Sequence, residues 1–244
     1  MAVLSVRGVT QSYGLGEAKI AVLRGVDLDV EAGELCAVMG PSGAGKSTLL
    51  HLAAGLDVPD AGAIEVLGTK LGSLDDQGRT LLRRDRIGIV YQFFNLVSNL
   101  TALENVLLPF MIAELEPDVA AAERALDRVG MGARKKHLPA QLSGGEMQLV
   151  SIARAIVRAP ALVLADEPTG NVNVATGRRI LTLLREVLKE TRSAMMMVTH
   201  NPEDAARADR VVFMKDGVIP SESAVLGPDI DVARIHERLR ELGI

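Results

Sequence analysis

A glycine-rich segment that ends in a lysine and two hydroxyl residues carries the strongest chemical signal in the sequence. Residues 40 to 48 read GPSGAGKST, which matches the phosphate-loop pattern of two glycines separated by four residues and followed by Lys and then Ser or Thr. The glycines allow successive backbone N–H groups to face phosphate oxygens, and a helix that begins near Ser47 would add its positive dipole end. Lys46 would reach the terminal phosphates, and the Ser47 hydroxyl could ligate Mg²⁺. The segment therefore predicts nucleotide binding.

A second candidate group is the pair of carboxylates that follows the apolar run at 161–165. Asp166 could hold the hydration shell of Mg²⁺, and Glu167 could polarise an attacking water molecule. Buried strands often end in acidic residues at a loop, so this stretch alone is equally consistent with an ordinary strand end. The phosphate loop upstream favours the catalytic interpretation.

The segment LSGGEMQ at 142–148 has both a structural and a functional interpretation. Ser143 followed three residues later by Glu146 is a capping box that would open a helix. A helix amino terminus with two glycines and a serine hydroxyl is also an anion site. Because the chain already has a phosphate loop, a second anion site indicates a nucleotide shared between two copies of the chain. This implies a dimer.

Alternating apolar runs and helical segments must position these groups. Continuous apolar runs, which predict buried strands, lie at 34–39, 87–91, 161–166, 193–200 and 210–217. Helical spacing is found between them at 47–56, 174–191 and 202–208. The alternation predicts an α/β fold with a mostly parallel sheet that is covered on both faces. Apart from the apolar run at its end, the segment 62–90 has the character of strands and turns.

Three further parts complete the predicted organisation. Residues 1–33 alternate apolar and polar side chains in short strands, which resembles an antiparallel flap. Residues 101–158 have helical patterns and form an insert within the α/β chain, and an amphipathic final helix would pack on the body or on a partner. We expect a single domain over residues 1–244. Its parts are a core with the β flap at about 1–92 and 160–218, a helical subdomain at about 93–159 and a C-terminal helix at about 229–243.

Composition and charge exclude several classes of protein. The chain of 244 residues is 48% hydrophobic and 24% charged, which is typical of a folded globular protein. A net charge of −4, with two Tyr, four Phe and no Trp, disfavours nucleic acid as a partner. The single cysteine, Cys36, cannot form an internal disulfide and lies in an apolar run. We therefore expect a buried thiol and a reducing compartment.

Five elements of the sequence, in this order and spacing, resemble a known family. The family is that of the ATP-binding cassette (ABC) ATPases. The chain resembles its Walker A element in GPSGAGKST, its Q-loop in Gln92, its signature in LSGGE, its Walker B element in LVLADE and its H-loop in His200. The resemblance covers nearly the whole chain, and the signature beside Walker A is highly specific. The stretches at 91–110 and 166–171 resemble a narrower group, the ATPase subunits of lipoprotein-release, macrolide-export and related envelope systems.

The resemblance implies a P-loop NTPase (RecA-like) fold and a head-to-tail dimer with two ATP molecules between the subunits. Each ATP, bound with Mg²⁺, would lie between the phosphate loop of one subunit and the LSGGE segment of the other. The residues expected on the nucleotide phosphates from the first subunit are Gly40, Ser42, Gly43, Gly45, Lys46, Ser47 and Thr48. Those expected on the γ-phosphate from the second subunit are Ser143, Gly144 and Gly145.

The same resemblance implies roles for residues that would not indicate a function by themselves. Tyr13 would stack on adenine, although a tyrosine packed in the flap is the alternative. Gln92 would contact Mg²⁺ and the attacking water, and would sense the transport partner. Glu167 would be the general base or water-orienting carboxylate, and His200 would hydrogen-bond the γ-phosphate and hold that water in line. The expected catalytic set is Glu167, His200, Gln92 and Lys46, and the expected Mg²⁺ ligands are Ser47, Gln92 and Asp166.

Two positions depart from the family pattern. Asn173 stands where the family carries an aspartate, so the charge that would tie this loop to the phosphate loop of the other subunit is missing. We expect that Asn173→Asp alters ATP turnover or its cooperativity. Leu149 stands where arginine is usual after the signature glutamine, which removes a cation from an exposed or interfacial side of that helix. This second change is expected to be tolerated.

Aromatic and basic clusters also mark parts of the chain. Half of the aromatic residues, Tyr91, Phe93 and Phe94, lie on one loop. They could form a docking groove for a partner helix, or they could pack the helical insert against the core. The segments RRDR at 83–86 and RKK at 134–136 are interpreted as solvated faces.

The resemblance implies a cytoplasmic ATPase subunit that hydrolyses ATP to ADP and phosphate and drives a transmembrane permease of an envelope or export system. No segment approaches the roughly 18 apolar residues of a membrane span, so the chain would lie on the inner face of the membrane through that permease. One alternative is a soluble cassette ATPase that clamps DNA or ribosomes without transport, which the acidic balance and single phosphate loop disfavour. Another is an ATP-gated regulatory binder with slow hydrolysis, which Asn173 keeps open and which Glu167 and His200 oppose.

Overall fold

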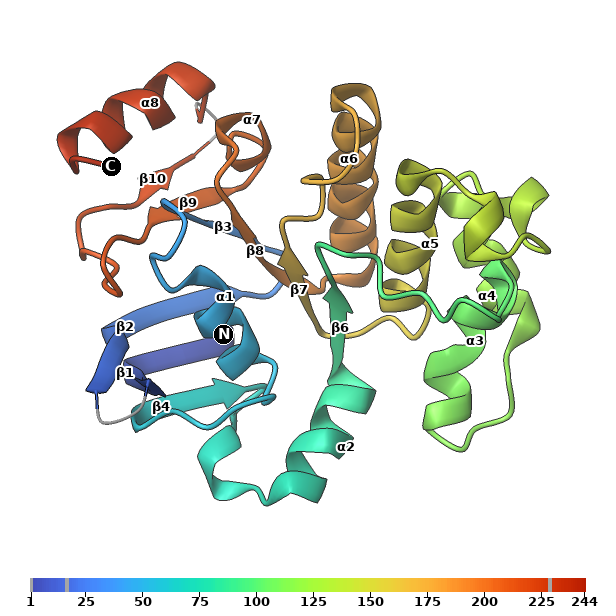
Figure 1. The fold of residues 1–244 in the computed structure, drawn as a ribbon, viewed down its shortest axis with the longest axis horizontal. Helices are drawn as coiled ribbons and strands as arrows, with labels where there is room; N and C mark the ends of the chain where they lie inside the picture. Colours follow the sequence, from blue (N-terminus) through green and yellow to red (C-terminus); the bar gives the residue numbers. More distant parts are fainter. Residues whose placement is uncertain (1, 16–17, 228–229) are drawn as a thin grey trace.

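Two β-sheets form the centre of the molecule (Figure 1). The computed structural model describes residues 2–15, 18–227 and 230–244. In spatial order, the larger sheet contains β10 (Val225–Leu226), β9 (Arg210–Phe213), β3 (Leu35–Met39), β8 (Ala194–Thr199), β7 (Leu162–Asp166) and β6 (Ile87–Val90). Neighbouring strands in it are parallel, except that β10 is antiparallel to β9. The predicted α/β fold with a mostly parallel core is confirmed.

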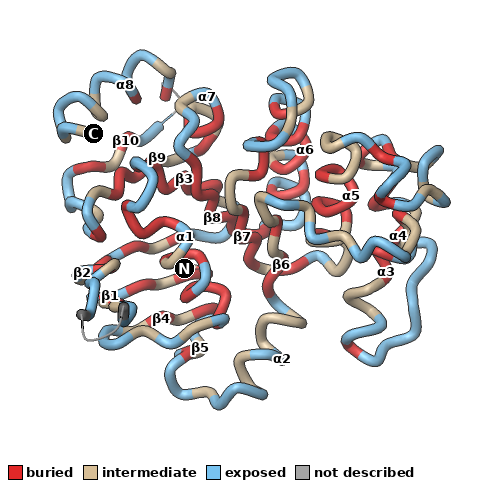
Figure 2. Tube along the Cα trace, viewed as in Figure 1, coloured by how far each residue is buried: buried red, intermediate tan, exposed pale blue. Residues whose placement is uncertain are grey.

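The parallel strands are apolar along their length because both faces of the sheet are covered. Every residue of β3 and β8 is buried, and Figure 2 shows these strands at the buried centre of the molecule. The carboxyl ends of parallel strands lie at one edge of a sheet, which is where ligands of such folds bind. The segments that follow β3, β6, β7 and β8 carry the phosphate loop, Gln92, Glu167 and His200 respectively. The fold therefore brings these predicted site residues to the same edge.

The smaller sheet is antiparallel and forms the flap. In spatial order, its strands are β2 (Ala18–Glu31), β1 (Ala2–Leu15), β4 (Ala61–Val66) and β5 (Thr69–Lys70). β1 and β2 are longer than the short strands expected from the sequence, and register shifts such as the one between Val6 and Val9 bend the pair without ending it. Apolar flap residues share one core cluster with Cys36 and Val38 of β3.

Helices cover both faces of the parallel sheet. On one face, α1 (Lys46–Ala53) contributes Leu49 to the same core cluster as the flap. On the other face, α6 (Val174–Thr191) and α5 (Gly144–Ile156) contribute to the main core cluster, together with Phe213 of β9. Both layers pack against continuous apolar strands, which explains why these strands show no alternation of polar and apolar residues.

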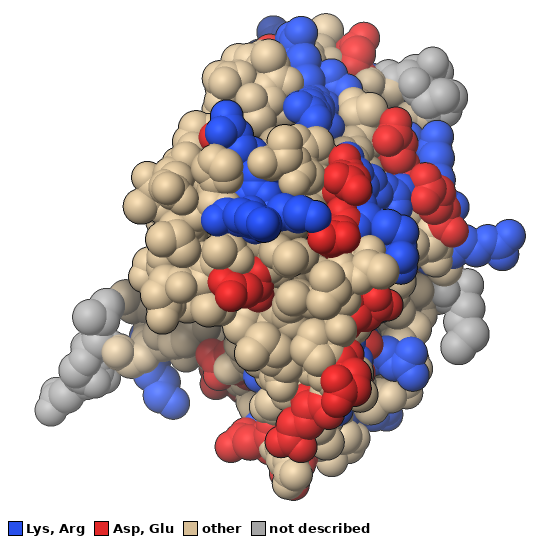
Figure 3. All heavy atoms as spheres, turned by 90° about the vertical axis from the view of Figure 1, so that its right-hand side faces the viewer, with Lys and Arg blue, Asp and Glu red and all other residues tan. Residues whose placement is uncertain are grey.

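The helical insert consists of α3 (Ala102–Ile112), α4 (Val119–Arg128) and α5, which pack on one another at the right of Figure 1. Buried Asn105 accepts a hydrogen bond from the Val97 N–H (2.8 Å) and donates one to the Leu100 carbonyl (2.9 Å), so it holds the chain segment that enters the insert. Figure 3 shows basic and acidic side chains side by side on the outer face of the insert. Short 3₁₀ helices in the described connections are η1 (Leu71–Ser73), η2 (Gly132–Arg134) and η3 (Pro139–Gln141).

One helix was not expected from the sequence. α2 (Asp76–Arg86) lies within the segment 62–90, in which strands and turns are predicted. Strands β4, β5 and β6 confirm that prediction toward both ends of the segment, and it is wrong over 76–86. The Asp75 side chain caps the helix, but none of its residues is buried. Its sequence therefore lacks the apolar stripe by which helical periodicity is detected. The interpretation of 83–86 as a solvated face is also wrong for Arg84 and Asp85, which are half-buried and paired at 2.9 Å.

The C-terminal helix α8 (Val232–Glu241) packs against α7 (Pro202–Ala205), so it lies on the body of the molecule. Residue 229, where the predicted range of this helix begins, lies outside the described residues. Lys215 Nζ donates hydrogen bonds to the carbonyl oxygens of Leu242 (2.9 Å) and Gly243 (2.8 Å). These bonds hold the end of α8 to the turn that follows β9, because they satisfy carbonyls that the helix end leaves unpaired.

Candidate functional site

The phosphate loop joins β3 to α1, in the strand, loop and helix order that its sequence pattern requires. Gly45 precedes the helix with a φ of 103°, and a Cβ there would lie 2.7 Å from the Leu23 side chain, so the turn requires glycine. Lys46 is 7% exposed, and its Nζ donates hydrogen bonds to the carbonyl oxygens of Gly40 (2.8 Å) and Pro41 (2.9 Å). Burial lowers the pKa of Lys46. The ammonium group lies against the loop backbone and can exchange these carbonyls for phosphate oxygens.

The hydroxyl of Ser47, in the first turn of α1, faces the carboxylate at the end of β7. Ser47 Oγ donates a hydrogen bond to Asp166 Oδ1 at 3.4 Å. The pKa of Asp166 is raised, mainly by burial and to a smaller extent by the negative charge of the neighbouring Glu167. A divalent cation is favoured beside a carboxylate whose charge is destabilised in this way, and Mg²⁺ prefers such oxygen ligands together with water and phosphate. The side chains at this position therefore fit Mg²⁺.

Glu167 and His200 come from neighbouring strands and are in direct contact. Glu167 follows β7 with a φ of 42°, a left-handed conformation that is costly for a residue with a side chain. Its Oε1 lies 2.6 Å from Nδ1 of His200, which directly follows β8. The Glu167 side chain is 17% exposed and that of His200 is 62% exposed. With Oε1 engaged by the imidazole, Oε2 can accept a hydrogen bond from a water molecule.

Gln92 lies two residues beyond β6 and is half-buried. The aromatic residues near it differ in their surroundings. The Phe93 side chain is 69% exposed, whereas Phe94 lies against the backbone of Gly144 in the signature segment. Tyr91 lines a groove between the core and the helical insert. Phe93 and Tyr91 are therefore available to a docking partner, and Phe94 packs within the chain.

The signature segment opens α5 with the predicted capping box. Glu146 Oε2 accepts hydrogen bonds from the N–H (2.8 Å) and the hydroxyl (2.9 Å) of Ser143, and Ser143 Oγ accepts one from the Glu146 N–H (3.3 Å). Ser143 is exposed, and Gly144 and Gly145 are half-buried. Figure 1 shows α5 and α1 on opposite sides of β7, so one copy of the chain presents the signature and the phosphate loop at different places.

Tyr13 lies on β1 of the flap with 40% of its surface exposed. Its hydroxyl donates a hydrogen bond to Asp57 Oδ2 at 3.1 Å. The pKa of Tyr13 is raised, mainly by partial burial and to a smaller extent by this hydrogen bond. The exposure disagrees with a tyrosine packed inside the flap, and it leaves the ring accessible for stacking on a flat ligand.

The two departures from the family pattern have structural roles. Asn173 caps α6, because its Oδ1 accepts a hydrogen bond from the Thr176 N–H at 2.9 Å. Leu149 is 5% exposed and belongs to the main core cluster. The expectation that position 149 faces an exposed or interfacial side is therefore wrong. The reason is that α5 lies between the sheet and the rest of the insert and is buried along most of its length.

A buried contact beneath the catalytic loops was not predicted. Asp204 of α7 is 6% exposed and accepts a hydrogen bond from the Thr169 hydroxyl. Burial raises the pKa of Asp204. Because Thr169 follows Glu167 by two residues and Asp204 follows His200 by four, this bond ties the two catalytic loops together. The one sequence signal for it is an acidic residue shortly after a motif, which is too common to single out.

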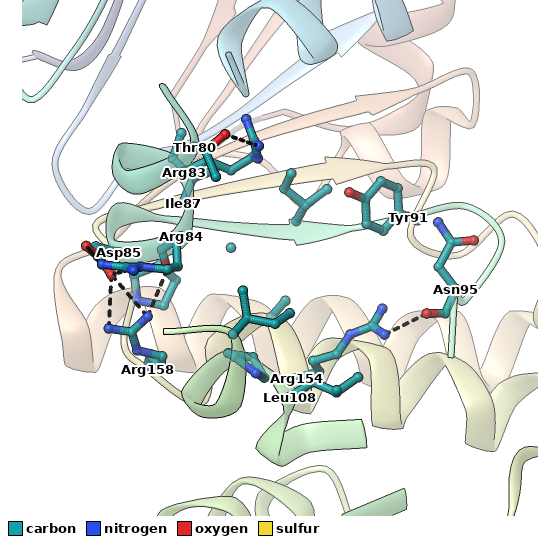
Figure 4. Close-up of a pocket in the computed structure, with 16 residues that line it drawn as sticks. Thr80, Arg83, Arg84, Asp85, Ile87, Tyr91, Asn95, Leu108, Arg154 and Arg158 are labelled. Carbon is teal, nitrogen blue, oxygen red and sulfur yellow. Dashed lines mark hydrogen bonds and ion pairs between the residues drawn. The ribbon is translucent and has the colours of Figure 1, made fainter. Parts of the chain in front are cut away.

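A groove of about 430 Å³ lies between α2, β6, α3 and α5 (Figure 4). The charged side chains that line it are Arg83, Arg84, Asp85, Arg154 and Arg158. Its apolar lining includes Ile89, Leu108, Pro109 and Ile112. The single carboxylate among these residues is shared, because Asp85 pairs with Arg84 (2.9 Å) and with Arg158 (3.2 Å). The groove therefore combines an apolar wall with a local surplus of positive charge, in a chain whose net charge is −4.

Known proteins are similar to this chain in sequence. A family model described as "ABC transporter" matches residues 23–170. The chain is 48% identical over 223 residues to the lipoprotein-releasing system ATP-binding protein LolD of Ruegeria pomeroyi, which covers 90% of this chain and 98% of that protein. It is 43% identical over 220 residues to a LolD protein of Rhodospirillum rubrum, with 89% and 97% covered.

Solved structures with the same fold are also similar in sequence. A dimeric ATP-binding cassette in a post-hydrolysis state, bound to ADP and Pi, has a TM-score of 0.83 and 38% identity, with 88% of this chain and 96% of that chain covered. A second structure, of a dimeric bacterial ABC transporter cassette, has a TM-score of 0.84 and 38% identity, with 91% and 98% covered. With the family model matching more than half of its length and relatives aligned over nearly their whole length, this chain belongs to the ABC transporter family.

Proposed function

We propose that this chain is the ATPase subunit of a lipoprotein-releasing transporter. As a member of the ABC transporter family, it hydrolyses ATP to ADP and phosphate and powers a membrane permease. The assignment to lipoprotein release is supported by the LolD relative, which is 48% identical and aligned over 98% of its length. The observation that carries the proposed hydrolytic mechanism is the contact between Glu167 and His200 at 2.6 Å, next to Asp166, to which Ser47 of α1 donates a hydrogen bond.

The phosphate loop and the start of α1 bind the nucleotide. Backbone N–H groups of the loop face the phosphate oxygens, with Lys46 on the terminal phosphates. Ser47, Asp166 and Gln92 would hold Mg²⁺, which would supply positive charge to neutralise the phosphates. Tyr13 of the flap stacks on the adenine.

Glu167 and His200 prepare the attacking water. The hydrogen bond from His200 Nδ1–H to Glu167 Oε1 fixes the orientation of the carboxylate. Oε2 then accepts a hydrogen bond from the water and receives its proton as the new oxygen–phosphorus bond forms and the bond from the γ-phosphorus to the ADP oxygen breaks. The bond between Asp204 and Thr169 holds the two loops that carry these residues, so that the distance between them is maintained.

A second copy of the chain completes each site. The helix that the signature segment opens, α5, and the helix that the phosphate loop opens, α1, lie on opposite sides of β7 (Figure 1). Ser143, Gly144 and Gly145 of the second copy therefore supply the helix amino terminus that meets the γ-phosphate. The dimeric assembly of both related cassette structures supports this arrangement.

The groove between the core and the helical insert is the proposed docking surface for the permease. Ile112, which lines it, is 66% exposed, and Met111 (56%) and Leu115 (49%) are exposed apolar side chains near it in the sequence; we take these three as an apolar rim. An amphipathic helix could place its apolar face on this rim. Among the described residues, no helix is long and apolar enough to cross a membrane. We propose that the chain is held at the inner face of the membrane through this groove.

The two alternative functions fit the site less well. A clamp on DNA or ribosomes would need a continuous basic face, whereas Figure 3 shows mixed charges on the insert. A regulatory binder with slow hydrolysis would not need a carboxylate and an imidazole in contact at 2.6 Å beside the phosphate loop.

Reconstitution with the membrane permease encoded in the same genome tests the proposal. In proteoliposomes loaded with an acylated lipoprotein, the wild-type complex should release the lipoprotein in the presence of MgATP and not of MgADP. Glu167→Gln should stop both hydrolysis and release. Hydrolysis that continues without any release of lipoprotein would refute the substrate assignment and leave the ATPase assignment intact.

A further inference from the structure

The loop at 91–95, which carries Gln92, is held by side chains of other segments. Backbone carbonyls outside regular structure need such partners when they are removed from water. Four carbonyl oxygens of this loop accept hydrogen bonds from side chains: Tyr91 from Gln148 Nε2 (3.4 Å), Gln92 from Asn171 Nδ2 (2.8 Å), and Phe94 and Asn95 from Arg154 (3.0 and 2.6 Å). Two of the donors, Gln148 and Arg154, belong to α5.

Arg154 holds the end of the loop that faces the groove. Figure 4 shows its side chain pointing from α5 toward Asn95. In the described part of the chain, Arg154 forms no ion pair, and its hydrogen bonds go to the carbonyl oxygens of Phe94 and Asn95. The rigid fork of a guanidinium group can hold two neighbouring acceptors at once, which the ammonium group of a lysine does less well. Arg154 therefore fixes the conformation of the loop through hydrogen bonds and not through an ion pair.

Gln148 ties the beginning of the loop to the segment after the general base. It is 1% exposed, and its Nε2 lies 2.8 Å from the Pro168 carbonyl and 3.4 Å from the Tyr91 carbonyl. Both neighbours are acceptors, so the amide nitrogen must face them. Pro168 directly follows Glu167 in the sequence. The Oε1 atom of Gln148 has no hydrogen-bond partner among the described residues, so the side chain is held by its contacts with these two carbonyls.

Both residues lie on the helix that the signature segment opens. Arg154 follows Ser143 by eleven residues, which is about 17 Å along a helix axis. Near Ser143, the Phe94 ring lies against the backbone of Gly144. The loop thus contacts α5 near its start, at Gln148 and near its end. Any movement of the loop relative to the helix would break these three contacts together.

We propose that Gln148 and Arg154 are positioning residues that fix the loop at 91–95 to the signature helix, so that Gln92 and Ser143 move as one unit. The inference rests on the proposed contact of Gln92 with Mg²⁺ and water. A permease helix that enters the groove touches Arg154 and Tyr91, which line it. The same movement then brings Gln92 to the nucleotide of its own copy and Ser143 to the nucleotide of the other copy.

Limited proteolysis of the isolated chain tests the attachment of the loop. Arg154→Met and Gln148→Met replace each polar side chain by an apolar one of similar length and remove the donor. Chymotrypsin cuts after aromatic residues, and Tyr91, Phe93 and Phe94 lie in this loop. It should cut there about tenfold faster or more in each variant, because local opening of the loop is no longer resisted. Arg154→Lys should resemble Arg154→Met. Arg124→Met, at an exposed position of α4, is the control and should be cut as wild type is. Unchanged cleavage within 91–95 in both methionine variants would overturn the proposal.

Kinetics in the permease complex test whether Arg154 acts through Gln92. Arg154→Met should lower kcat by about 10- to 100-fold, as small misplacements of catalytic groups do, while KM for ATP stays within about threefold. Gln92→Ala added to Arg154→Met should cause little further loss, because both changes remove the same contribution. A double variant whose loss of kcat equals the product of the losses of the two single variants would contradict the proposal. The proteolysis experiment involves neither permease nor lipoprotein, so it decides this inference even if the proposed transport function fails.

Discussion

Replacing Glu167 with glutamine should separate ATP binding from ATP hydrolysis. The amide has the shape of the carboxylate, and its oxygen can still accept the hydrogen bond that His200 Nδ1 gives to Oε1 at 2.6 Å. It cannot accept a proton from water. A positioned general base accelerates a reaction by about 10²- to 10⁴-fold, so kcat in the permease complex should fall by about that factor. The Kd for MgATP should change by less than about threefold, since no phosphate contact is removed.

Stalled hydrolysis should also reveal the shared site. In light scattering after size exclusion, Glu167→Gln should have twice the 26.0 kDa mass of one chain in MgATP and the mass of one chain in MgADP. Glu203→Gln is a matched control, because Glu203 is exposed and pairs with Arg178 at 3.4 Å. This control should keep wild-type turnover and should show no trapped dimer.

The trapped dimer should depend on Ser143. In the Glu167→Gln background, Ser143→Ala should abolish the change of mass in MgATP. Loss of the helix cap is controlled by Thr101→Ala, because Thr101 forms the same capping box with Glu104, at the same 3.3 Å from the N–H to the hydroxyl oxygen. Each alanine substitution should lower the free energy of unfolding by about 1 kcal/mol, but only Ser143→Ala should prevent dimerisation. A Glu167→Gln protein that binds MgATP and stays monomeric at every concentration would refute the shared site.

Three further predictions concern single side chains. Asn173→Asp should change ATP turnover or its cooperativity in the intact complex but leave the unfolding midpoint nearly unchanged, because Asp and Asn cap helices equally well; identical steady-state kinetics would contradict this. Burial raises the pKa of Asp204 above its unfolded value of 3.8, so its ionisation lowers stability as pH rises through the folded pKa. Asp204→Asn keeps an acceptor for Thr169, so urea unfolding should show a higher free energy of unfolding than wild type at pH 7, with the gain vanishing toward pH 3.8. Burial also raises the pKa of the Cys36 thiol to about 12, so a thiol reagent at pH 8 should label the native chain at least about 100-fold more slowly than the urea-unfolded chain.

Features that depend on neighbouring residues could be predicted from the sequence. The phosphate loop between β3 and α1 follows from one continuous segment, and so does the capping box of Ser143 and Glu146. The parallel core could be predicted because apolar runs without alternation are typical of strands covered on both faces. The α2 helix could not be predicted in this way, because it buries none of its residues and its sequence therefore has no apolar face.

Contacts between distant segments left no pattern in the sequence. Arg154 binds the carbonyl of Asn95 across 59 positions, and Thr169 binds Asp204 across 35. The side chain of Arg154 meets a backbone carbonyl, and every residue has one, so no residue type marks its partner. Leu149 could not be placed for a similar reason: which side of α5 is buried depends on the insert and the sheet together.

The division of the site between two copies also determines when the dimer opens. A ligand shifts a conformational equilibrium only by the difference between its affinities for the two states. In the proposed mechanism, ATP favours the closed dimer because the helix amino terminus at Ser143 meets the γ-phosphate, which ADP lacks. Once Glu167 has directed water to that phosphate, this proposed contact between the two copies would be lost. Because Arg154 attaches the loop at 91–95 to the same helix, a permease bound in the groove must move when the two signature helices separate.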